Sequence, residues 1–122
     1  MPQIHSINVA DAPLERFDPP GMTVLGEDPQ GRTFTLAQDG PDGDGFQPGG
    51  YATGVMACSP GKVSYFLTQR ETLQVLEGEV RIELDNGEVV ELGPGDLATL
   101  PAGHMSTWTF KSDYKELWVL SS

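Results

Sequence analysis

Apolar and polar residues alternate with a period of two along most of the chain after Gly50. Residues 79–85 are the clearest case, because Val80, Ile82 and Leu84 alternate there with charged side chains. This alternation is typical of β-strands that present one face to a core. The same criterion predicts strands at residues 32–36, 51–59, 62–70, 88–92, 97–100, 106–110 and 115–120.

Turn signals separate these segments at short intervals. Asn86-Gly87 predicts a two-residue hairpin turn, and Gly- and Pro-rich turns are expected at residues 93–96 and 101–103. No stretch has the period of an amphipathic helix, and the sequence of 122 residues fits one domain. The pattern therefore predicts an all-β, single-domain sandwich or barrel.

The first part of the chain has a weaker pattern. We expect residues 1–50 to form an N-terminal arm, with the short strand at 32–36 and a Gly/Pro/Asp loop at 38–50, in the same domain as a barrel core at 51–122. The arm is expected to wrap the barrel or a partner.

Charge and cysteine content narrow the class of protein. Seven basic and eighteen acidic residues give a net charge of −11, a field that repels nucleic acid and anionic membranes. Cys58 is the single cysteine, so no intrachain disulfide is possible, and no apolar stretch is long enough to span a membrane. We expect a cytoplasmic protein without nucleic-acid or membrane partners.

Three segments resemble the cupin superfamily, in the small-cupin branch related to ureidoglycine aminohydrolase and the ethanolamine-utilisation cupins. They are GKVSYFLTQRETLQVLEGEV, DNGEVVELGPGDLATLPAG and STWTFKSDYKELWVL, within residues 53–120. Gly61, Gly78, Gly95, Pro101 and Gly103 match the glycine and proline positions of the two cupin motifs. The resemblance implies a cupin jelly-roll β-barrel, and it implies a homodimer that pairs through edge strands and N-terminal arms.

The resemblance also locates the positions of the family's metal ligands. They fall on Tyr65, Leu67, Glu71 and Ser106, where related aminohydrolases hold manganese with a Glu, two His and a Gln. Only Glu71 is a metal-ligating type, whereas a protein site usually supplies at least three ligands. We therefore expect no metal and no cofactor. The alternative is a metal-dependent enzyme that uses His104, which shares the strand parity of Ser106, with Glu71 and with His5 from the arm.

The remaining side chains predict a ligand pocket. Strand parity places Tyr65, Leu67 and Glu71 on one face of a single strand, and the resemblance turns this face inward together with Ser106, Trp108 and Phe110. We also expect His104 and Met56 to line this pocket. Met56 stands where many relatives carry a tryptophan. Such an aromatic-lined pocket suits a small organic ligand. The alternative is that these aromatic side chains fill the barrel as core.

Glu71 is the candidate catalytic residue, with Tyr65 as its partner. Apolar surroundings raise the pKa of a carboxyl group towards neutrality, where it can act as a general acid or base in an isomerase, cyclase or lyase reaction. Two alternatives stay open: a non-catalytic ligand-binding or regulatory module, or a structural Glu71 that is held by hydrogen bonds. Lys115 is expected at the surface, paired with Glu116 or Asp113 or meeting an anionic group of the ligand.

Overall fold

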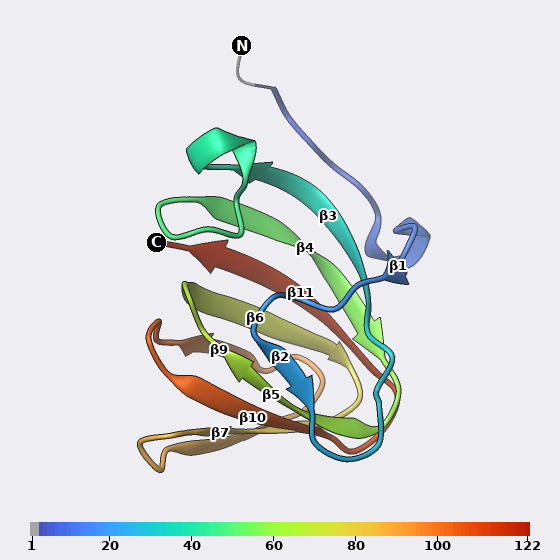
Figure 1. Ribbon diagram of the computed structural model, residues 1–122. Coiled ribbons are helices and arrows are strands. Elements are labelled where there is room, and N and C mark those ends of the chain that lie inside the picture. The colour runs from blue at the N-terminus through green and yellow to red at the C-terminus, as the bar shows by residue number, and fades with distance from the viewer. Residues whose placement is uncertain (1–2) are drawn as a thin grey trace.

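Two antiparallel sheets face each other in the computed structural model, which describes residues 3–122 (Figure 1). The strand order is β1-β3-β4-β11-β6-β9 in the six-stranded sheet and β2-β5-β10-β7-β8 in the five-stranded sheet. The elements are η1 (Val9–Asp11), β1 (Glu15–Arg16), β2 (Met22–Val24), β3 (Arg32–Asp39), η2 (Pro41–Gly43), β4 (Tyr51–Cys58), β5 (Gly61–Phe66), β6 (Arg70–Glu77), β7 (Val80–Leu84), β8 (Val89–Leu92), β9 (Leu97–Leu100), β10 (Met105–Phe110) and β11 (Tyr114–Ser121).

The core lies between the two sheets and follows the predicted alternation. On β11, every second side chain from Tyr114 to Leu120 is buried, and on β10 the buried positions are Ser106, Trp108 and Phe110. Each of these strands is paired on both sides, β11 with β4 and β6, and β10 with β5 and β7. The all-β prediction and the jelly-roll architecture are confirmed.

Residues 62–77 differ from the prediction of one strand at 62–70. The chain leaves the five-stranded sheet at Phe66, bends at Thr68 and Gln69, and enters the six-stranded sheet at Arg70. The period-two pattern continues across this crossing, and no Gly or Pro marks it. The single-strand prediction is therefore wrong, because the bend is imposed by pairing of Leu67 with the 103–104 turn rather than by local turn residues.

Two further short strands come from the N-terminal arm. β1 pairs with β3, and β2 pairs with β5, so the arm adds an edge strand to each sheet. Figure 1 shows the blue N-terminal segment leading into β1, which pairs with the first residues of β3, before the chain continues to β2. Only β3 was predicted in this region, since two- and three-residue strands are too short to show a period.

The β7–β8 hairpin is present, but its turn is shifted from the predicted Asn86-Gly87 centre. The Gly87 amide donates to the carbonyl of Leu84 at 3.0 Å, so Asp85 and Asn86 are the central residues. Gly87 then adopts a φ of 93°, in the left-handed region that glycine reaches without strain. The loop is longer than a two-residue turn, as in three-residue hairpins.

The backbone around Gly78 explains why this motif position is a glycine. Its φ is 82°, and a Cβ at this position would lie 2.1 Å from the carbonyl oxygen of Asp113. Any other residue would clash with the backbone that joins β10 to β11, so the turn after β6 requires glycine.

Among residues 3–122, neither helical segment could cross a membrane, as each is a single short turn.

Candidate ligand-binding site

A cavity of about 110 Å³ lies between the two sheets. Aromatic and aliphatic side chains form most of its wall, and two carboxylates, those of Glu71 and Glu116, also line it. The aromatic residues of the wall are Phe17, Phe46, Tyr65, Trp108, Phe110 and Trp118. Tyr65, Glu71, Met56, Trp108 and Phe110, all predicted for the pocket, therefore meet at one cavity.

Glu71 reaches the cavity from β6, where it lies opposite Leu120 of β11. Its side chain is buried, with only 6% of the residue exposed, and no group among residues 3–122 donates a hydrogen bond to its carboxylate. Burial disfavours the charged form and raises the pKa of Glu71 from 4.5 to about 7. At neutral pH the carboxyl group is therefore partly ionised and can either accept or donate a proton.

Tyr65 faces Glu71 from the opposite sheet rather than from the same strand. Tyr65 lies on β5 and Glu71 on β6, so the prediction that they share one strand face is wrong, because the chain changes sheets between them. Both still line the cavity. Burial, and to a smaller extent the charge of Glu71, raise the pKa of Tyr65, so its phenol remains a hydrogen-bond donor at neutral pH.

Glu116 is a second carboxylate of the cavity that the sequence analysis placed at the surface. It lies on β11 with 2% of the residue exposed, and the Tyr114 hydroxyl donates to its Oε1 at 2.7 Å. Burial and the neighbouring Glu71 charge raise the pKa of Glu116 well above its usual value, and the Tyr114 hydrogen bond opposes this. The alternation of residues 114–120 already placed Glu116 on the face of Trp118 and Leu120.

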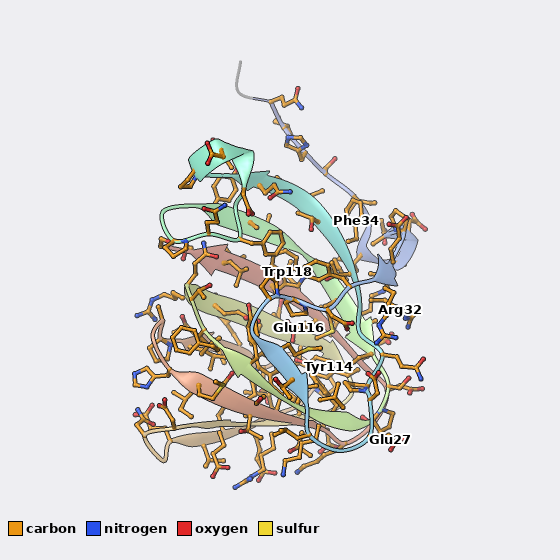
Figure 2. All side chains as sticks on the ribbon, in the orientation of Figure 1. Glu27, Arg32, Phe34, Tyr114, Glu116 and Trp118 are labelled. Atoms are coloured by element: carbon orange, nitrogen blue, oxygen red, sulfur yellow. The ribbon has the colours of Figure 1, made fainter. Side chains whose placement is uncertain are left out.

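The surface pair expected for Lys115 is therefore not formed with Glu116. The Lys115 ammonium instead donates to the backbone carbonyl of Val9 at 2.9 Å and ties the arm to β11. The arm and the 40–50 loop also shape the cavity, because Phe17 packs on Phe46 and Phe46 packs on Trp118, each with ring centroids 5.8 Å apart. Figure 2 labels Tyr114, Glu116 and Trp118 along β11.

Three residues predicted for the pocket lie elsewhere. Leu67 is fully buried in the apolar core, and the Ser106 hydroxyl donates to the Tyr65 carbonyl at 2.6 Å and accepts from Trp108 Nε1 at 2.8 Å. His104 Nδ1 lies 2.7 Å from Asp85 Oδ1 at the protein surface. None of the three is among the residues that line the cavity. Leu67 and Ser106 do point into the protein, but apolar packing and hydrogen bonds occupy them there, and His104 is turned to the surface by Asp85.

The residues at the family's metal positions do not fit a metal ion. Of Tyr65, Leu67, Glu71 and Ser106, only Glu71 offers a carboxylate, and the Ser106 hydroxyl is already hydrogen-bonded. His104 does not share the cavity with Glu71, and His5 is exposed beside Gln3. Within the described part of the chain, no group of three His, Cys, Asp or Glu side chains could hold a metal.

Two facing antiparallel sheets around an internal cavity are consistent with the cupin class of small β-barrels. The sequence model of the EutQ-like cupin domain matches residues 47–116, and the chain belongs to this family. A comparison with curated proteins found no match.

Solved structures share the fold at low sequence identity. The putative ethanolamine utilization protein Q of Salmonella typhimurium is 23% identical with a TM-score of 0.61, and the alignment covers 75% of this chain and 68% of that one. The polyketide cyclase RemF of Streptomyces resistomycificus is 21% identical with a TM-score of 0.65, over 97% and 79% of the two chains. A Rhizobium leguminosarum protein of unknown function is 20% identical with a TM-score of 0.65, and the alignment covers 97% of this chain and 96% of that one.

Proposed function

We propose that this cupin binds a small organic molecule in the cavity between its sheets, without a metal, and that Glu71 performs acid–base chemistry on it. The observation that carries the proposal is the Glu71 carboxylate, which lines an aromatic cavity and has no hydrogen-bond partner among the described residues. A carboxyl group that faces a cavity and whose pKa is raised by burial is typical of a functional site.

The proposed chemistry follows from the two groups that face each other. An ionised Glu71 takes a proton from a carbon or hydroxyl of the ligand and returns it at another atom, while the Tyr65 phenol donates a hydrogen bond to the developing oxyanion. This cycle suits an isomerase, cyclase or lyase and needs no further cofactor. The name of RemF, a polyketide cyclase, supports only that a barrel of this shape accommodates cyclase chemistry.

Ligand binding in the cavity is tested by filling it. Met56 lines the cavity from β4, and Met56→Trp extends a larger ring into it. We expect ligand-observed NMR of a mixed small-molecule library to detect binders to the unmodified protein and to Met105→Trp, but not to Met56→Trp. Met105 is 41% exposed and does not line the cavity, so it controls for the added ring. Binders that are retained by Met56→Trp would place the site elsewhere.

Glu71→Gln separates catalysis from binding. The amide keeps the shape of the side chain but cannot take up a proton at neutral pH. With a ligand that is converted by the unmodified protein, we expect turnover at saturating ligand to fall by about 10²-fold or more. A ligand that binds and is never converted would instead favour the non-catalytic module.

We further propose that the protein works in the cytoplasm, with Cys58 as a free, buried thiol.

A further inference from the structure

The cavity wall carries two acidic side chains, and among the described residues its buried donor without a hydrogen-bond partner is Trp118 Nε1. Glu71 and Glu116 both line the cavity, and none of the lining residues is a lysine, arginine or histidine. The Glu116 carboxylate accepts one hydrogen bond from Tyr114, and the Glu71 carboxylate accepts none from residues 3–122. Two buried carboxyl groups thus share one space with no basic side chain, whereas buried acids in proteins are normally paired. The missing partner is a positive charge or a strong donor.

The wall limits what that partner can be. Most of it is aromatic or aliphatic, so a polyol would leave hydroxyl groups facing apolar side chains without hydrogen bonds. An anion would meet two carboxylates at once. A divalent metal is disfavoured, since no group of three suitable ligands exists among the described residues. An alkylammonium group satisfies both surfaces, because its N–H groups donate to carboxylates and its carbons contact the rings.

The size of the cavity sets the scale of the ligand. Its volume is about 110 Å³. An apolar cavity of ~150 Å³ accommodates benzene, so this cavity holds a group of about six non-hydrogen atoms or fewer. The rings of Trp108 and Phe110, whose centroids lie 6.0 Å apart, provide faces that attract a cation.

We infer that the ligand carries a compact alkylammonium group, which enters the cavity between the Glu71 and Glu116 carboxylates and the aromatic wall. This inference rests on the proposed ligand-binding function and names the chemical class of its ligand. The ammonium nitrogen lies at the carboxylate end of the cavity, and the alkyl carbons lie against the rings.

The test uses three probes of nearly equal shape and different charge: isobutylammonium, isobutanol and isobutyrate. Titrations follow the two indole N–H signals of the ¹⁵N-labelled protein, since Trp108 and Trp118 both line the cavity. Ionic strength is held constant so that the net charge of −11 acts equally throughout. We expect isobutylammonium to bind about tenfold more tightly than isobutanol, and isobutyrate to leave both signals unchanged.

Two variants and one matched control locate the charge. Glu71→Gln and Glu116→Gln each remove one buried carboxylate, whereas Glu88→Gln removes an exposed one from the β7–β8 hairpin. We expect each buried variant to weaken isobutylammonium binding about tenfold and to leave isobutanol binding unchanged. Glu88→Gln should bind isobutylammonium as tightly as the unmodified protein does. A loss of affinity in this control as large as in the buried variants would mean that general surface charge causes the effect, and it would overturn the inference.

A pH titration of the unmodified protein keeps the test decisive if a buried variant does not fold. The groups around the site are Glu71 on β6, Glu116 and Tyr114 on β11, Tyr65 on β5 and Cys58 on β4. Burial raises the pKa values of both tyrosines and of Cys58, so these three stay protonated and only the carboxyl groups titrate. Isobutylammonium affinity should rise from about pH 6 to about pH 8 as Glu71 ionises, and isobutanol affinity should stay constant.

The outcomes separate the two proposals. Equal or tighter binding of isobutanol or isobutyrate in the cavity would overturn the ammonium inference and leave the ligand-binding proposal in place. Isobutylammonium binding that is unaffected by Glu71→Gln and Glu116→Gln, or by pH, would overturn it as well. If no probe moves either indole signal and the library screen finds no ligand that binds the unmodified protein but not Met56→Trp, both proposals are wrong.

Discussion

The burial of Glu71 and Glu116 has an unfavourable free energy in a small barrel. Each carboxyl group loses its water on folding, and only Glu116 gains a hydrogen bond from another side chain in the described structure. Burying an unpaired charge costs several kcal/mol, so the group protonates instead, which is why both pKa values rise. Leucine at either position would pack the cavity without this cost, so the pair is best explained by function.

The raised pKa of Glu71 predicts how stability depends on pH. The pKa is about 7 in the folded protein and 4.5 for an unperturbed side chain, so between these values the folded state holds a proton that the unfolded chain has released. The free energy of unfolding therefore falls as the pH rises through this window. For Glu71 the full loss is on the order of 3 kcal/mol, because each unit of the difference between about 7 and 4.5 corresponds to about 1.4 kcal/mol.

Urea unfolding at intervals from about pH 5 to about pH 8 measures this effect. Glu71→Gln should show a flatter pH dependence than the unmodified protein, since Glu116 then remains the only carboxyl group of the cavity. Glu88→Gln, which alters an exposed side chain, should keep the original slope. An identical slope in the unmodified protein and Glu71→Gln would show that Glu71 is not desolvated in solution.

At the scale of elements, Gln69 connects the sheet crossing to the loop that bears Phe46. Its Nε2 donates to the carbonyls of Gly45 and Gly50, each at 3.0 Å, and the residue is 2% exposed. The Asp44 carboxylate accepts from the Phe46 amide at 2.9 Å and fixes the turn from inside. One side chain at the β5–β6 bend thus holds the loop whose phenyl ring packs on Trp118.

Gln69→Ala should release this loop. Both carbonyls lose their donor, which costs about 2 kcal/mol in unfolding free energy. We also expect amide hydrogen exchange of residues 44–50 to become faster and the affinity of cavity ligands to fall. Gln74→Ala is the matched control, because its Nε2 contacts the Gly95 carbonyl only at 3.5 Å and far from the loop. Unchanged exchange of residues 44–50 in Gln69→Ala would mean that the loop is held by other contacts.

At the scale of the whole molecule, the N-terminal arm leaves apolar side chains in solvent. Residues 3–9 are all exposed, and Ile4 is exposed to 94%. We propose that this arm packs against a second copy of the chain, as the expected homodimer requires. Each copy carries a net charge of −11, so two copies repel one another until salt screens the field.

Light scattering after size-exclusion chromatography tests the dimer. We expect a mass of twice 13.2 kDa, with a dissociation constant that decreases as salt rises from about 50 to about 500 mM. Ile4→Ser combined with Ile7→Ser should shift the protein towards the monomer. Met105→Ser removes an exposed apolar side chain from β10, outside the arm, and should not. A dimer that resists the double substitution would place the interface elsewhere, and a monomer under all conditions would contradict the dimer.

The sequence by itself determined most of the strands and the direction of their side chains. Alternation predicted β7, β9, β10 and β11 to within a residue or so, because a half-buried strand must place apolar groups at every second position. The motif glycines and the cupin resemblance then predicted the jelly roll. Met56, Trp108 and Phe110 could be predicted as cavity residues for the same reasons, and Glu116 could have been, since it shares the parity of Trp118.

Tertiary structure alone decided which strands belong to which sheet. The alternation is the same on both sides of the bend at Gln69, so nothing local indicates that Tyr65 and Glu71 face each other from opposite sheets. Long-range pairing also placed the arm and the Phe46 loop on the cavity, and it turned His104 towards Asp85. A period-two pattern specifies faces but not partners, and the site is built from partners that are distant in sequence.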